Sequence, residues 1–250
     1  MSFQLTGCLK GTSDVGVILP TYSEAENIAN LIEEIERLPV EAAILVIDDS
    51  SPDRTTEVVE KLQEKYGNIL LCVRPEKLGL GTAIRDGFKI FLSLKFPPKF
   101  IIVMDADYSH DPKVIPRLLA KMQDGCGVVV GSRYCRGGEI AGWSCTRKIA
   151  SRAANVAAKF LVGLKLDDCT SGFRCYSTGF VRAAIEGLHS QTYEIQIETL
   201  RQAFSRGFRI KETPILFVNR KLGKSKLSLM EIQSYILYVF ETVLRGRNRL

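Results

Sequence analysis

The chain has 250 residues, of which 46% are hydrophobic and 25% are charged. This composition supports a large buried core, and it excludes both a disordered polar chain and a protein embedded mainly in a membrane. The net charge of +6 is unevenly spread, because residues 1–132 hold 14 Lys and Arg against 19 Asp and Glu, whereas residues 133–250 hold 20 against 9. This asymmetry predicts that the C-terminal half meets a partner with anionic groups.

The cysteines and the apolar stretches bear on the cellular compartment. There are seven cysteines, an odd number, and no two of them have Cys-x-x-Cys spacing. This usage predicts a reduced, cytosolic chain. Residues 1–11 lack the features of a signal peptide. The longest apolar stretch, residues 227–244, contains Glu231, Gln233 and Glu241, so no membrane-spanning helix is predicted.

Strands and helices are predicted to alternate along the first half of the chain. Apolar runs predict strands at residues 15–19, 42–47, 69–73, 100–104 and 127–130. Helical periodicity predicts a first helix that extends to Leu38, and Ser23 and Glu26 form a capping-box pair at its start. It predicts further helices at 54–66, 81–94 and 112–122. Continuous apolar strands that alternate with helices indicate βα units around a mostly parallel sheet. After Gly131 the pattern loosens to helices at 146–161 and 193–205 and a strand at 215–218.

Polar clusters follow three of the predicted strands, at residues 20–24, 48–53 and 105–110. Open α/β sheets bind ligands at this edge. Asp105 and Asp107 can turn toward one point, and two hard oxygen donors suit Mg²⁺ or Mn²⁺. The alternative is a solvated turn in which Asp107 or Ser109 caps the next helix.

The other two clusters have similar alternatives. Residues 48–53 are either a turn with a helix cap or a site where a carboxylate contacts a ribose or base. Tyr22 is either a core aromatic residue or a ring on which a base stacks. The chain has only two histidines, so a histidine-rich metal site is excluded.

Basic residues gather later in the chain, with Arg133 after a strand, Arg147 and Arg152 near a helix start, and Arg220 and Lys226 in a Gly/Ser loop. Each alone could be a solvated surface charge. A phosphate-containing ligand requires a metal site together with arginines, so basic residues that face the carboxylates at the strand ends would suit such a ligand. Nucleic acid is not predicted as a partner, because aromatic residues are not interleaved with the basic ones and the N-terminal half is acidic.

Several motifs in fixed order resemble a known family. Those of the first half are Pro20-Thr21-Tyr22-Ser23-Glu24, Asp48-Asp49-Ser50-Ser51-Pro52-Asp53, Gly79-Leu80-Gly81-Thr82-Ala83 and Asp105-Ala106-Asp107-Tyr108-Ser109-His110. They are similar to the nucleotide-sugar half of inverting family 2 glycosyltransferases of the GT-A fold. Those of the second half are Gly131-Ser132-Arg133-Tyr134, Gly142-Trp143, Arg147-Lys148-Ile149-Ala150-Ser151-Arg152, Thr170-Ser171-Gly172-Phe173-Arg174, Phe217-Val218-Asn219-Arg220 and Gly223-Lys224-Ser225-Lys226-Leu227. These resemble the dolichol-phosphate mannosyltransferases, over residues 14–245.

The resemblance implies a Rossmann-like GT-A fold, GDP-mannose as donor and a dolichyl or other polyprenyl phosphate as acceptor. It implies nucleotide-sugar contacts at Pro20, Tyr22, Glu24, Ile47, Asp49, Asp105, Ala106, Asp107, Arg220 and Lys226. It implies acceptor-phosphate contacts at Arg133, Arg147 and Ser151, and catalytic roles for Asp107, Arg133 and Arg220.

The resemblance also implies a divalent metal, Mg²⁺ or Mn²⁺, on Asp105 and Asp107. Some members have glutamine where this chain has Ser109, so the resemblance assigns no third side-chain ligand there. The chain is similar to the short form of the family, which lacks appended transmembrane helices and can use a small membrane subunit. We therefore expect a peripheral protein at the cytoplasmic face of a membrane, the endoplasmic reticulum in a eukaryote or the plasma membrane in a prokaryote.

Two domains follow from this interpretation: a catalytic domain over residues 1–226 and an amphipathic interface helix with a basic tail over residues 227–250. That helix either lies on a membrane surface or docks on the core or a second copy. The rival functions are transfer of glucose from UDP-glucose to a polyprenyl phosphate, and a non-catalytic nucleotide-sugar-binding module. The Arg133 and Arg147 set argues against the module, because a pure binder needs no acceptor site.

Overall fold

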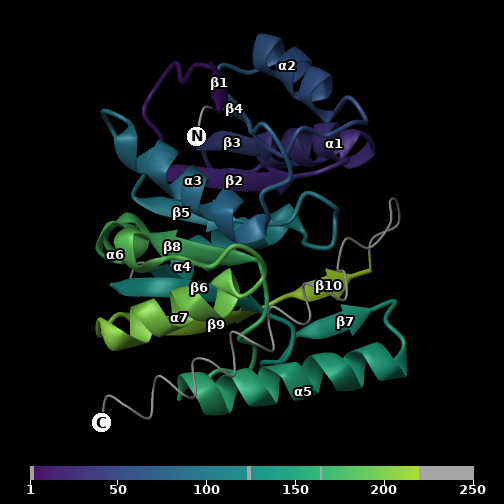
Figure 1. Ribbon diagram of the computed structural model, residues 1–250, viewed down its shortest axis with the longest axis vertical. Helices are drawn as coiled ribbons and strands as arrows, with labels where there is room; N and C mark the ends of the chain where they lie inside the picture. Colours follow the sequence, from purple (N-terminus) through teal and green to yellow (C-terminus); the bar gives the residue numbers. More distant parts are fainter. Residues whose placement is uncertain (1–2, 123–124, 164, 220–250) are drawn as a thin grey trace.

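Residues 3–122, 125–163 and 165–219 are described by a computed structural model (Figure 1). Its strands are β1 (Gln4–Gly7), β2 (Val15–Thr21), β3 (Ala42–Asp48), β4 (Ile69–Val73), β5 (Phe100–Val103), β6 (Cys126–Ser132), β7 (Glu139–Ala141), β8 (Arg174–Ser177), β9 (Arg209–Pro214) and β10 (Leu216–Val218). Its helices are α1 (Ala25–Glu36), α2 (Thr55–Lys65), α3 (Leu80–Ser93), α4 (Ile115–Met122), α5 (Cys145–Val162), α6 (Thr178–Ala184) and α7 (Ile195–Ser205), with short 3₁₀ turns η1 (Pro112–Val114) and η2 (Ile185–Gly187).

The main sheet has eight strands in the order β1-β4-β3-β2-β5-β8-β6-β9. Strands β4, β3, β2 and β5 are parallel neighbours, and so are β6 and β9, whereas β1 and β8 run antiparallel to the strands beside them. The predicted mostly parallel sheet is confirmed. Because the parallel strands share one carboxyl edge, the loops after β2, β3 and β5 meet there.

Helices cover both faces of this sheet (Figure 1). Residues of α3, α6 and α7 pack in one buried cluster with one set of strand side chains, and residues of α1, α2 and α4 pack in another with the opposite set. Covering both faces explains why β3 is buried at all seven positions and reads as a continuous apolar run. The fold is therefore a three-layer α/β architecture.

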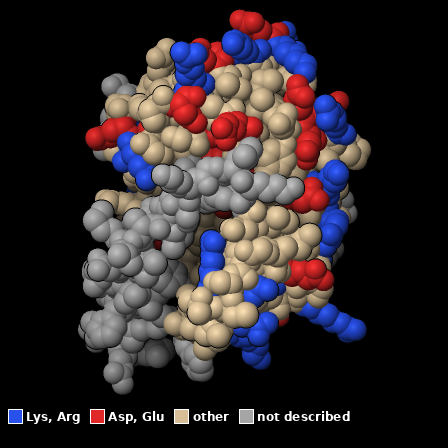
Figure 2. Space-filling view, turned by 90° about the vertical axis from the view of Figure 1, so that its right-hand side faces the viewer, with Lys and Arg blue, Asp and Glu red and all other residues tan. Residues whose placement is uncertain are grey.

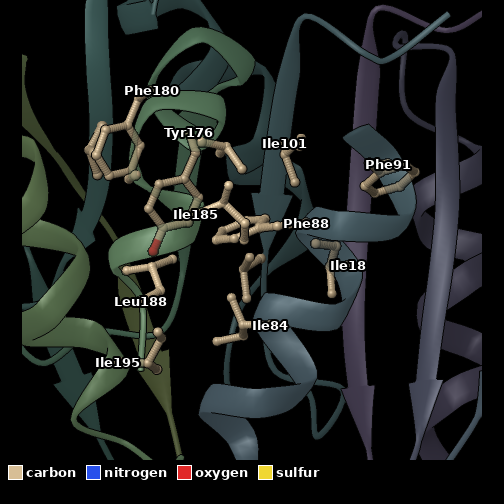
Figure 3. Packing of buried hydrophobic residues seen from close by; sticks show 14 of the residues in the cluster. Ile18, Ile84, Phe88, Phe91, Ile101, Tyr176, Phe180, Ile185, Leu188 and Ile195 are labelled. Atoms are coloured by element: carbon tan, nitrogen blue, oxygen red, sulfur yellow. The ribbon is translucent and has the colours of Figure 1, made fainter. Parts of the chain in front are cut away.

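Aromatic side chains join α3 to β8 in the first of these clusters (Figure 3). The ring of Phe88 meets the ring of Tyr176 edge to face, with centroids 5.2 Å apart, and Phe180 stacks on the other side of Tyr176 at 5.9 Å. Such contacts add to the area that the rings bury. They fix the second half of the sheet, which carries β8, against the first half.

Strands β1, β7, β8 and β9 and helix α6 were not predicted. Strand β8 begins with Arg174, which is fully buried and donates hydrogen bonds to the backbone oxygens of Cys169, Ser171 and Gln196 and to Thr199 Oγ1. A charged residue that is satisfied by tertiary partners carries no strand signal in the sequence. Strands β7 and β10 form a separate parallel pair beside the main sheet.

The predicted cap of α1 is wrong. Ser23 has φ 56° and its N–H donates to Ser51 Oγ, and the residue before the helix is Glu24, whose side chain makes no capping bond. Instead, Asp53 Oδ2 accepts from the N–H of Ala25 at 3.0 Å. The N-terminus of α1 is thus capped by Asp53, a side chain from the loop after β3, and not by a residue next to the helix in sequence.

Within the described residues, no helix has both the length and the apolar character that crossing a bilayer requires. The predicted helix at 227–250 lies outside the described residues.

Candidate donor and acceptor sites

A cavity of about 100 Å³ opens at the carboxyl edge of the sheet. Its lining includes eight of the ten predicted nucleotide-sugar residues, which come from the last residues of β2 and β3 and from the loops after β2, β3 and β5: Pro20, Tyr22, Glu24, Ile47, Asp49, Asp105, Ala106 and Asp107. The other two, Arg220 and Lys226, lie outside the described residues. In Figure 2, Lys and Arg side chains predominate over Asp and Glu side chains on the lower half of the described surface, whereas both kinds are mixed on its upper half.

In each of the three loops, the residue that follows a predicted ligand residue has a left-handed backbone conformation, with positive φ. Ser23 follows Tyr22, Ser50 follows Asp49 and Tyr108 follows Asp107, with φ of 56°, 52° and 59°. This conformation is costly for residues other than glycine, and it persists where the surroundings impose it. The chain therefore turns sharply after each strand, at the points where these side chains meet the cavity.

The side chains of Asp105 and Asp107 differ in their exposure to solvent. The Asp105 side chain is 38% exposed, whereas Asp107 is buried and its Oδ1 accepts the N–H of Ser109 at 3.0 Å. The N–H of Asp105 donates to His110 Nδ1 at 3.3 Å. Burial lowers the pKa of His110 to about 4, so the ring is neutral at pH 7 and acts as an acceptor that fixes the backbone of Asp105.

The donor set here fits a divalent cation. Asp105 and Asp107 supply two carboxylates at one cavity, and the buried hydroxyl of Ser109 has no hydrogen-bond partner among the described residues. The described residues contain no group of three or more His, Cys, Asp and Glu side chains that would form a closed metal cage. Two carboxylates at an open cavity suit Mg²⁺ or Mn²⁺, which keep positions for water and phosphate oxygens.

Asp49 is held by a residue that the sequence analysis missed. The fully buried Arg74 donates from Nε to Asp49 Oδ1 at 2.6 Å and from Nη1 to Thr82 Oγ1 at 2.7 Å. Asp49 Oδ2 accepts the N–H of Leu78. Burial raises the pKa of Asp49, and Arg74 opposes that rise. No spacing pattern indicates this pair, because Arg74 simply follows a strand 25 residues later in the chain.

The motif Gly79-Leu80-Gly81 forms the start of α3 at the cavity, and its glycines allow a close backbone approach. A Cβ on Gly79 would lie 2.5 Å from the carbonyl oxygen of Gln191, and one on Gly81 would lie 2.5 Å from that of Ser190. The N–H groups of Gly81 and Thr82 donate to the Gln191 carbonyl oxygen at 2.9 and 3.3 Å. These two N–H groups at the start of α3 are therefore already hydrogen-bonded to the protein's own backbone.

Arg133 lies after β6, buried against the loop before β8. Its Nε and Nη2 donate to the two carboxylate oxygens of Asp168 at 2.7 and 2.8 Å, and Nη2 also donates to Thr170 Oγ1. Burial would lower the pKa of Arg133, but Asp168 and, more weakly, Asp105 raise it. Arg133 therefore stays charged. It follows β6 at the same sheet edge as Asp105 after β5, because β5 and β6 both run antiparallel to β8.

The other predicted acceptor residues gather near Arg133 on α5. The guanidinium of Arg147 lies 4.2 Å from the centroid of the Trp143 ring, and that of Arg133 lies 5.7 Å from it. Ser151 Oγ accepts the hydroxyl hydrogen of Tyr134 at 2.8 Å. The three residues predicted to meet the acceptor phosphate are thus connected through two aromatic rings.

Further residues of these sites carried no signal in the sequence. Asp168 holds Arg133, and Tyr193 and Lys77 line the cavity, with Lys77 Nζ 5.0 Å from the centroid of the Tyr22 ring. A lone aspartate, tyrosine or lysine far along the chain has no recognisable motif, and only folding brings it to the site.

The family model described as "Glycosyl transferase family 2" matches residues 16–184. The chain belongs to glycosyl transferase family 2. The match spans the strands that carry the cavity, Arg133 and the helix with Arg147 and Ser151. The GT-A fold expected from the resemblance is confirmed.

Two curated relatives are similar over most of the chain. The polyprenol monophosphomannose synthase of Mycolicibacterium smegmatis is 34% identical over 233 residues, covering 92% of this chain and 87% of the relative. The undecaprenyl-phosphate mannosyltransferase of Micrococcus luteus is 34% identical over 212 residues, covering 84% and 86%.

A solved structure shares the fold of this family 2 chain. It is glucosyl-3-phosphoglycerate synthase from Mycobacterium tuberculosis in complex with Mn²⁺, uridine diphosphate and phosphoglyceric acid. The TM-score is 0.64 at 19% identity, with 93% of this chain and 78% of that chain covered. At this identity the likeness concerns the fold alone.

Proposed function

We propose that this glycosyltransferase transfers mannose from GDP-mannose to dolichyl or another polyprenyl phosphate, with inversion at the anomeric carbon. The observation that carries the proposal is the pairing of two sites at one edge. Strands β5 and β6 both run antiparallel to β8, so Arg133, which follows β6, lies at the same sheet edge as the cavity with Asp105 and Asp107. Two relatives at 34% identity, named for mannosyl transfer to polyprenyl phosphates, support the choice of sugar and acceptor.

The acceptor side needs cationic residues more than a general base. A phosphate monoester has a second pKa near ~6 and is largely a dianion at pH 7, so its oxygen attacks without losing a proton. Arg133, held by Asp168, and Arg147, held against Trp143, would orient this dianion toward the anomeric carbon. Ser151 would add a hydroxyl donor beside them.

The donor side would bind the nucleotide and its leaving diphosphate. Tyr22 and Asp49 would contact the nucleoside, with Asp49 kept in place by Arg74. Asp105 and Asp107 would hold Mg²⁺ or Mn²⁺, which supplies Lewis-acid stabilisation of the diphosphate as it leaves. We assign Arg220 and Lys226 to the same diphosphate, as residues of a loop that lies outside the described residues.

The remaining parts of the proposal concern the membrane. We propose that residues 1–226 are catalytic and that residues 227–250 contact the cytoplasmic face of the membrane that holds the acceptor, with or without a small membrane subunit. The test is flotation with liposomes of the full chain and of a chain that ends at residue 226. Equal binding by both would refute a membrane role for residues 227–250.

The experiment that tests the reaction uses the full chain with radiolabelled donors and a prenyl phosphate. GDP-mannose, UDP-glucose and the exchanged pairs, GDP-glucose and UDP-mannose, are each supplied with Mg²⁺, with Mn²⁺ or with EDTA. We expect mannosyl transfer from the GDP donor that EDTA abolishes. Transfer from UDP-glucose alone would replace the proposed donor by its rival, and binding without any transfer would indicate a nucleotide-sugar-binding module.

A further inference from the structure

Trp143, the one tryptophan of the chain, lies in the turn between β7 and α5. The residue before it, Gly142, has φ 78°, and a Cβ there would lie 2.9 Å from the Cβ of Asn219. The N–H of Asn219 donates to the carbonyl oxygen of Ala141 at 3.1 Å, which holds the end of β10 against this turn. Both the backbone conformation and the packing therefore require glycine at position 142, and the turn sets the position of Trp143 at the start of α5.

The indole ring of Trp143 lies among the residues predicted to meet the acceptor phosphate. The guanidinium carbons of Arg147 and Arg133 lie 4.2 and 5.7 Å from the ring centroid, and the ring of Phe217 meets the indole edge to face at 5.2 Å. A guanidinium over an indole face is attracted to it. Arg147 belongs to an exposed part of α5, so this contact limits the positions that its long side chain can take.

The N–H group of the same indole is an unsatisfied donor. Nε1 of Trp143 is shielded from solvent and makes no hydrogen bond to the residues that the structure describes. An indole nitrogen can only donate, and tryptophans in such positions usually have an acceptor. A shielded donor without an acceptor costs free energy, so a ligand that supplies an acceptor oxygen gains affinity.

The charges around Trp143 favour an anionic ligand. The sequence of α5 over Cys145–Val162 contains four Lys and Arg residues and neither Asp nor Glu. Hydrogen bonds to charged acceptors are shorter and stronger than those between neutral groups. A phosphate monoester carries nearly two negative charges at pH 7 and has three acceptor oxygens, so it can pair with two guanidiniums and one indole N–H together.

We propose that Trp143 is a binding residue of the acceptor site, whose indole N–H donates to an oxygen of the acceptor phosphate and whose ring holds Arg147 beside that phosphate. This inference rests on the proposed function, because it takes Arg133 and Arg147 as the acceptor side. Trp143 adds a neutral donor of fixed direction to these two cations. It therefore helps to orient the phosphate for attack as well as to bind it.

The test uses the fact that the chain has a single tryptophan. Growth on benzothienylalanine, in which sulfur replaces the ring N–H, removes this donor at position 143 alone and keeps the shape of the ring. Trp143→Phe keeps an aromatic face without the N–H, and Trp143→Leu removes both. Calorimetry on the full chain with Mn²⁺ measures the Kd of geranyl phosphate and of GDP and UDP.

We expect the benzothienylalanine protein and Trp143→Phe to bind geranyl phosphate roughly tenfold or more weakly, because a hydrogen bond to a charged group is lost. Trp143→Leu should weaken it about two- to fivefold further, because the contact with Arg147 is lost as well. The Kd of whichever nucleoside diphosphate the wild type binds should stay unchanged. The matched control is Phe96→Leu, since the Phe96 ring is 60% exposed and lies 5.4 Å from Lys95 Nζ, and it should leave every Kd unchanged.

The outcomes separate this inference from the proposed function. Equal binding of geranyl phosphate by the wild type and the benzothienylalanine protein refutes the role of Trp143 and leaves the proposed function standing. Equal losses for geranyl phosphate and the nucleoside diphosphate also refute it, because they indicate that Trp143 supports the fold alone. A wild-type chain that binds a nucleoside diphosphate but not geranyl phosphate overturns the proposed acceptor together with this inference.

Discussion

The carboxylate of Asp168 holds the guanidinium of Arg133 in a paired geometry, with Nε to Oδ2 at 2.7 Å and Nη2 to Oδ1 at 2.8 Å. Both side chains are buried, at 0% and 7% exposure. The same carboxylate accepts the backbone N–H groups of Arg133, Thr170 and Ser171. The pair therefore fixes a cation at the proposed acceptor side and ties the end of β6 to the loop before β8.

Removing the Asp168 carboxylate should be costly for stability. In Asp168→Ala, Arg133 would remain buried without a counter-charge, and breaking a buried pair in this way costs about 3–5 kcal/mol. We expect the free energy of unfolding, measured by urea denaturation, to fall by this amount. The control is Asp14→Ala, which removes an ion pair with Lys99 whose side chains are 66% and 69% exposed. That change should cost at most about 1 kcal/mol, and equal effects of the two substitutions would contradict the prediction.

The same pair predicts how stability depends on pH. Burial alone would raise the pKa of Asp168, but Arg133 and the N–H donors outweigh burial and hold that pKa below its usual value. The unfolded chain therefore takes up its proton first, near pH ~3.9, and the contribution of Asp168 is lost as the pH falls further. Urea denaturation should give a constant difference between the wild type and Asp168→Ala from pH 8 to 5, and a shrinking one below about pH 4. A difference that stays constant or grows below pH 4 would show that the pKa is not lowered.

The metal assignment predicts the behaviour of Asp107→Ala. Losing one group that stabilises the leaving diphosphate should lower the transfer rate on the order of 10²–10³-fold. The measurement is radiolabelled transfer to a prenyl phosphate, with EDTA on the wild type for comparison. Asp111→Asn is the control, because Asp111 is exposed and caps η1 through the N–H of Lys113. Near-normal turnover by Asp107→Ala would refute the assignment.

Thiol reactivity tests the packing of the fold itself. Cys8 and Cys145 are exposed, Cys135 is half-buried, and Cys72, Cys126, Cys169 and Cys175 are buried. Burial raises the pKa of Cys72 and of Cys169 to about 11, so their thiolate forms are scarce as well as shielded. Ellman's reagent at pH 8 should react rapidly with two thiols in the native protein and with all seven in guanidinium chloride. The double variant Cys8→Ser, Cys145→Ser should lack the rapid phase, and rapid reaction of the buried thiols would contradict the packing.

Local signals in the sequence predicted the first half of the fold well. The apolar runs at 15–19, 42–47 and 69–73 appear as strands β2, β3 and β4, because strands covered on both faces must be apolar throughout. The order of strands and helices placed the residues after β2, β3 and β5 at one edge, and these residues now line one cavity. In the second half, β8 and β9 were not predicted, because Arg174 and Arg209 open them and break the apolar pattern.

The sequence by itself determined the family, the parallel core and the candidate residues of the donor and acceptor sites, because each depends on residues that are close together in the chain. Only the tertiary structure decided which distant residues hold those candidates in place. Arg74 reaches Asp49 and Asp168 reaches Arg133 across 25 and 35 residues. The physical reason is that burying a charge requires a partner, and the chain supplies that partner from wherever folding brings one close.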